Sequence, residues 1–132
     1  MKILLTHPNL INIVNKIQEN CSTTITGSTN FEEVLAMAKA GEIEKIGIVF
    51  EITRINTLDF IKQIYKINPS IPILAWDCTL HFEELEEHPE LLEDHIFFID
   101  SARLKTDSFF ECFDKFFSKT LTEFDFTELE KA

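Results

Sequence analysis

The run Ile46-Gly47-Ile48-Val49-Phe50-Glu51 limits what this chain can fold into more than any other stretch. It is almost continuously apolar, too short for a buried helix, and it ends on a carboxylate. Such a run is typical of a strand that is covered on both faces in the middle of a parallel sheet. Glu51 is then expected just outside the carboxyl end of that strand, where open α/β sheets bind their ligands.

Short apolar runs and helical patterns alternate along the rest of the chain. We expect strands over 2–6, 23–26, 46–51, 71–76 and 96–99, and helices over about 10–20, 30–40, 58–67 and 106–121. Asn30 with Glu33 resembles a capping box, and Gly41 fits a left-handed cap at the end of the same helix. Asn68, which precedes a proline, is expected to end the third helix. The segment 80–94 carries seven acidic residues and no Lys or Arg, and we expect at most a short helix there.

This alternation predicts an α/β fold of the flavodoxin-like (βα)5 type, a three-layer sandwich with helices on both faces of a parallel sheet. The strand order that fits five such units best is 2-1-3-4-5. We expect one domain over residues 1–121, followed by an acidic C-terminal tail over 122–132.

The amino-acid composition argues against several classes of function. The 132 residues include 23 acidic and 12 basic side chains, a net charge of −11, which opposes direct binding to nucleic acid or to an anionic membrane. No apolar run approaches the length of a membrane-spanning helix. Three dispersed cysteines without a CxxC pair favour free thiols and a cytoplasmic protein. The chain has only three glycines and no glycine-rich phosphate loop, so we expect no nucleotide and no other cofactor.

The length, the order of elements and the residues at the strand ends resemble the receiver domain of bacterial response regulators, over residues 1 to about 121. Receivers carry an acidic pair after the first strand, a phospho-accepting Asp after the third, Thr or Ser after the fourth, and Lys-Pro after the fifth. The residues that stand at these positions here are His7-Pro8, Glu51, Asp77 and Asp100-Ser101.

These departures imply a degenerate phosphorylation site, composed of His7, Pro8, Glu51, Asp77 and Asp100. Mg²⁺ prefers hard oxygen ligands, and His7-Pro8 supplies no carboxylate. Asp100 replaces the cation that would neutralise phosphoryl oxygens, and Glu51 is one methylene longer than the Asp nucleophile. The resemblance therefore implies a non-catalytic pseudo-receiver, a protein–protein interaction or dimerisation module in bacterial signal transduction. The alternative is a switch that still accepts a phosphoryl group or a small ligand at the His7/Glu51/Asp77 rim.

Two further features bear on ligands and partners. A histidine and three carboxylates at strand ends could hold Zn²⁺ or Mn²⁺, but no pair has close ligand spacing, so a solvated acidic rim without metal is expected. The last helix carries a broad apolar arc, wider than one side of a sheet needs. We therefore expect a protein partner or a homodimer to contact it through Phe110, Phe117 and Leu121 on one edge or Cys112 on the other, the alternative being a core filled with Phe.

Overall fold

The computed structural model describes residues 1–6, 12–49, 57–76, 89, 95–99 and 108–118. Within these residues the chain forms five strands, β1 (Lys2–Thr6), β2 (Thr26–Ser28), β3 (Lys45–Val49), β4 (Ile73–Trp76) and β5 (Ile96–Ile99). The four described helices are α1 (Asn12–Glu19), α2 (Phe31–Lys39), α3 (Thr57–Ile67) and α5 (Ser108–Ser118). The predicted short helix within 80–94, the extension of the last helix to residue 121 and the predicted tail lie outside the described residues.

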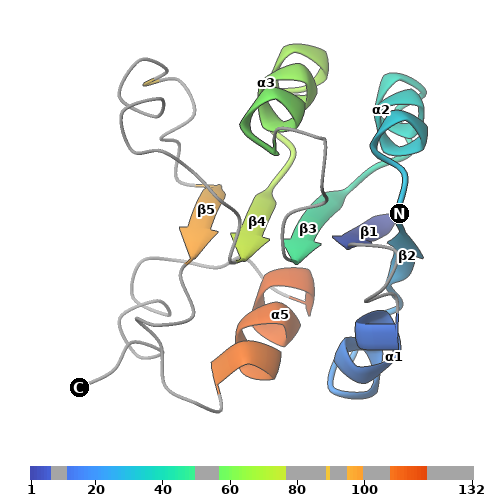
Figure 1. Cartoon of the computed structure of the whole chain (residues 1–132), viewed down its shortest axis with the longest axis vertical. Coiled ribbons are helices and arrows are strands. Elements are labelled where there is room, and N and C mark those ends of the chain that lie inside the picture. Colours follow the sequence, from blue (N-terminus) through green and yellow to red (C-terminus); the bar gives the residue numbers. More distant parts are fainter. Residues whose placement is uncertain (7–11, 50–56, 77–88, 90–94, 100–107, 119–132) are drawn as a thin grey trace.

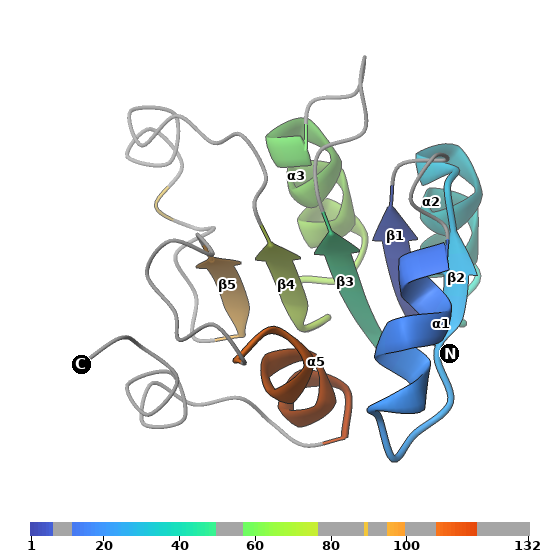
Figure 2. The ribbon, with the colours of Figure 1, turned by 60° about the horizontal axis from the view of Figure 1, so that its bottom comes forward.

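The strands form one sheet in the order β2-β1-β3-β4-β5, and every neighbouring pair is parallel. Figure 2 shows the strand arrows pointing the same way across the sheet. This confirms the predicted flavodoxin-like α/β fold and its strand order. β3 is the central strand, with β1 and β4 on its two sides, which explains why the sequence of β3 is apolar on both faces.

Of the described helices, α2 and α3 cover one face of the sheet and α1 and α5 cover the other (Figure 1). Side chains alternate between these faces along each strand. In β3, Ile46 and Ile48 join the core under α2 and α3, while Val49 joins the core under α1 and α5. Each face therefore has its own hydrophobic core, and the sheet lies between them.

The predicted ends of α2 are confirmed. The Asn30 side chain accepts a hydrogen bond from the Glu33 backbone N–H at 3.1 Å, which satisfies one free donor of the first turn. The second half of a capping box is missing, because the Asn30 N–H donates to the Ser28 hydroxyl and not to Glu33. At the other end Gly41 has φ +76°, and the Glu42 N–H returns to the Met37 carbonyl at 3.0 Å, as in a Schellman cap.

The second strand begins three residues and ends two residues later in the chain than predicted. The β-branched run 23–26 suggested a strand that Gly27 would end, but Gly27 lies inside β2 and pairs with Leu4 of β1. A Cβ atom at Gly27 would lie 2.9 Å from Val14 Cγ2 of α1. The absence of a side chain at Gly27 thus lets α1 approach this edge strand closely, a requirement of tertiary packing that β propensity does not express.

Gly47 has a comparable role at the centre of the sheet. It pairs with Leu4 on one side and Leu74 on the other. The rings of Phe117 and Phe113 on α5 lie directly over it, so that a Cβ atom would be 2.9 Å from Phe117 Cζ and 3.3 Å from Phe113 Cε1. The one residue without a side chain in β3 is therefore where α5 packs on the sheet.

Candidate functional site

The carboxyl ends of four strands form one row across the sheet. Thr6 pairs with Val49, Val49 with Trp76, and Trp76 with Ile99. Adjacent strands lie about 4.8 Å apart, so the chain leaves the sheet at four points spaced by roughly that distance. In a sheet of this order the topological switch point lies between β1 and β3, and ligands bind outside the carboxyl ends there. The row Thr6, Val49, Trp76 and Ile99 is therefore the base of any ligand site at this edge.

The predicted site residues follow this row in the sequence. His7 and Pro8 follow β1, Glu51 follows β3 by two residues, Asp77 follows β4 and Asp100 follows β5. All five lie outside the described residues, so their expected grouping stays a prediction. The row beneath them carries no ionisable side chain. Any acid–base or metal chemistry at this edge must therefore come from residues beyond the strands.

Thr6 is the one polar residue in the row. Its side chain is fully buried, and its Oγ1 atom has no hydrogen-bond partner among the described residues. By strand alternation it lies on the same face as Leu4, in the layer of α1 and α5. The described residues leave Thr6 Oγ1 without a partner, and a buried hydroxyl in that state costs about 1–3 kcal/mol, which makes Thr6→Val an informative substitution at the switch point.

Replacing Thr6 by valine should raise the free energy of unfolding by about 1 kcal/mol, because the change keeps the shape and removes an unpaired hydroxyl. Thr23→Val is the matched control. The Thr23 hydroxyl accepts a hydrogen bond from Lys2 Nζ at 2.8 Å, and its loss should destabilise the protein by about 0.5–1.5 kcal/mol. Urea unfolding followed by circular dichroism measures both. If Thr6→Val destabilises the protein instead, the hydroxyl has a partner in solution.

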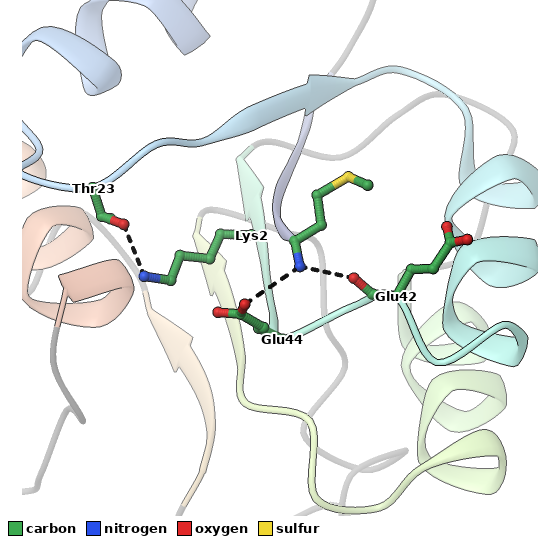
Figure 3. A network of polar contacts seen from close by, with 5 residues as sticks. Lys2, Thr23, Glu42 and Glu44 are labelled. Carbon is green, nitrogen blue, oxygen red and sulfur yellow. Dashed lines mark hydrogen bonds and ion pairs between the residues drawn. The ribbon is translucent and has the colours of Figure 1, made fainter.

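A polar network lies at the opposite, amino edge of the sheet (Figure 3). The Met1 ammonium donates to the Glu42 carbonyl at 2.8 Å and lies 3.6 Å from the Glu44 carboxylate. The Glu44 N–H donates to the Met1 carbonyl at 2.8 Å, which extends the contact between β1 and the residues before β3. Lys2 reaches the other way, to Thr23 in the connection between α1 and β2. These contacts fix the amino end of β1 to the connection before β2 and to the residues before β3. We therefore assign them a structural role.

Lys45 is the second lysine at this edge and pairs with Lys2 in the sheet. Its ammonium donates to the Phe116 carbonyl in the last turn of α5 at 2.7 Å and lies 5.7 Å from the Phe116 ring centroid. A cation there complements the negative end of the helix dipole. Burial lowers the pKa of Lys45 below its ordinary value, Lys2 lowers it further, and Glu44 opposes this shift. Lys45 thus anchors α5 to β3.

A second set of contacts holds the same end of α5. The Ser22 N–H donates to Asp114 Oδ1 at 3.1 Å, and the Ser118 hydroxyl donates to the same oxygen at 3.0 Å. The hydroxyls of Ser22 and Ser118 lie 2.8 Å apart. Sequence analysis missed this network. Its members are ordinary surface residue types, and Ser22 is more than ninety positions from Asp114 and Ser118, so only the packing of α1 beside α5 brings it to them.

The described cysteines are unsuited to nucleophilic chemistry. Burial raises the pKa of the Cys21 thiol to about 11, with the Asp114 carboxylate as a second cause. Burial raises the pKa of Cys112 to about 12, with Glu111 as a second cause. Both therefore stay protonated near neutral pH, whereas a reactive cysteine needs a lowered pKa. This agrees with the expectation that they are free structural thiols.

The predicted partner surface on the last helix requires correction. Cys112 and Phe117 are fully buried within the domain, so the prediction that they lie on exposed edges of the helix is wrong. Phe110 is partly buried against the same core, and Leu121 lies outside the described residues. The broad apolar arc exists because α5 packs against the sheet and also beside α1. A helix with two neighbours needs a wider stripe than a helix lying on a sheet alone.

Among the residues that the structure describes, no three His, Cys, Asp or Glu side chains are placed to hold a metal ion. None of the helices in the described ranges is both long and apolar enough to cross a membrane. Met1 is the only large hydrophobic side chain in the described part of the chain that is exposed. Neither a scan against models of protein families nor a search of curated proteins found a match to this chain.

Proposed function

We propose that this chain is a non-catalytic pseudo-receiver that acts as a protein–protein interaction or dimerisation module in bacterial signalling. The observation that carries the proposal is the row of strand ends, taken with the residues that follow it. The sheet order 2-1-3-4-5 brings the carboxyl ends of β1, β3, β4 and β5 into one register row. A receiver carries its phosphorylation chemistry at this edge, and this chain has His7-Pro8, Glu51, Asp77 and Asp100 in the corresponding sequence positions.

The residue types argue against phosphoryl transfer. Such transfer is catalysed chiefly by positioning and by cations that neutralise the transferring oxygens. The positions after the strands supply three carboxylates and a histidine, without a lysine or an arginine at any of them. An anionic phosphoryl donor would meet a negative field there, while Mg²⁺ would lack the acidic pair that holds it in receivers. The proposal therefore keeps the receiver fold and assigns it the binding of a protein partner in place of phosphoryl transfer.

The chemical part of the proposal is tested with acetyl phosphate and Mg²⁺. We expect the intact mass to stay unchanged after prolonged incubation, because both the metal ligands and the cation are missing. Glu51→Gln and Asp77→Asn form the matched pair of variants. A stoichiometric gain of one phosphoryl group by the wild type, lost in Glu51→Gln and kept in Asp77→Asn, would contradict the proposal and favour the phosphoryl-accepting switch.

The side chains that the described part of α5 could present to a partner include Glu111, Lys115 and the partly buried Phe110. Glu111 is exposed, and Lys115 Nζ lies 3.5 Å from its carboxylate in an i,i+4 ion pair. Lys115 is partly buried, and an i,i+4 ion pair of this kind contributes on the order of 0.3–0.5 kcal/mol to stability, so we expect the helix to stay folded when its charges are exchanged. Asp59 and Lys62 form a similar pair on α3, on the other face of the sheet.

We expect the protein to self-associate through α5, and Glu111→Lys with Lys115→Glu to weaken that association. The double exchange keeps an ion pair within the helix but inverts the charges that a partner meets. The same exchange on α3, Asp59→Lys with Lys62→Glu, is the control and should leave association unchanged. Sedimentation velocity over a wide concentration range measures both. A wild-type chain that stays monomeric at high concentration would rule out the homodimer. A loss of association in the α3 variant alone would contradict an interface on α5 and place it on α3.

A further inference from the structure

We draw no further inference here: the strongest candidate, the buried Thr6 hydroxyl at the carboxyl end of β1 beside β3, has no hydrogen-bond partner among the described residues, but residues 7–11 and 50–56, which follow these two strands, lie outside the described part of the chain, so nothing in the structure shows what covers or binds it.

Discussion

Replacing Phe117 by glutamate is expected to unfold the protein at room temperature. The Phe117 side chain is fully buried, with its ring centroid 5.1 Å from that of Phe116 and 6.1 Å from that of Phe113. A carboxylate in this place would be buried against the rings of Phe113 and Phe116, and burying a charge among apolar side chains costs more free energy than a small domain can lose and stay folded. Single domains of this size are stable by only about 5–15 kcal/mol in total.

Phe117→Ala is a milder substitution, and its effect on the free energy of unfolding can be measured. We expect it to lower the free energy of unfolding by about 3–5 kcal/mol, because it removes a buried ring and leaves a cavity between α5 and the sheet. Glu111→Ala on the exposed side of the same helix is the control and should change stability by no more than about 0.5 kcal/mol. Equilibrium urea unfolding of the three chains measures the difference.

The outcome also separates the two interpretations of the last helix. If Phe117 belongs to the core, Phe117→Glu loses its cooperative unfolding transition and its far-ultraviolet circular dichroism together. A Phe117→Glu protein that folds like the wild type but no longer associates would instead place this ring at an interface between molecules. That result would contradict the buried position of Phe117 and restore the exposed apolar edge that the sequence pattern suggested.

The second large effect is expected at Gly47. An added Cβ atom would lie 2.9 Å from Phe117 Cζ and 3.0 Å from Leu4 Cδ1, closer than side chains pack. Gly47→Ala should therefore destabilise the protein by about 1–3 kcal/mol, as overpacked cores do. This loss should appear although alanine is otherwise favoured over glycine in a strand, by roughly 0.5–1 kcal/mol of backbone entropy. Gly47→Val should be worse, because two methyl groups would enter the same space.

A double variant tests whether the cause is steric. Phe117→Leu shortens the side chain above Gly47, so Gly47→Ala should cost less in that background than in the wild type, and the two changes should not add. Gly41→Ala is a control with a different mechanism. No atom lies within 4 Å of an added Cβ there, but φ is +76°, so its cost comes from the backbone alone. Purely additive free energies for Gly47→Ala and Phe117→Leu would contradict a steric cause.

Gly41 shows how far local rules reach in this chain. Glycine has no Cβ atom and so adopts the left-handed region without a steric cost, and the end of a helix can therefore be predicted from this single residue type. The same holds for the Asn30 cap, where the partner is only three residues away. These features were predictable because the residues that decide each of them are close neighbours in the chain.

The sequence alone determined the fold class, the strand order, both ends of α2 and the carboxyl-terminal end of α3. Apolar runs of strand length that alternate with helical patterns can bury their side chains only in a layered sheet, and right-handed crossovers leave few possible orders. The identity of the residues after each strand, and hence the chemical argument about Glu51 and Asp100, also follows from the sequence. Their mutual arrangement stays a prediction.

The tertiary structure decided which apolar residues are core and where the short second strand lies. An apolar arc on α5 does not reveal what covers it, and Cys112 and Phe117 are buried in a domain that packs this helix against both the sheet and α1. β2 is placed by its pairing with β1 and by the approach of Val14 to Gly27, not by the β-branched residues before it. In both cases the deciding contacts join residues far apart in the chain, and hydrophobic periodicity carries no information about those partners.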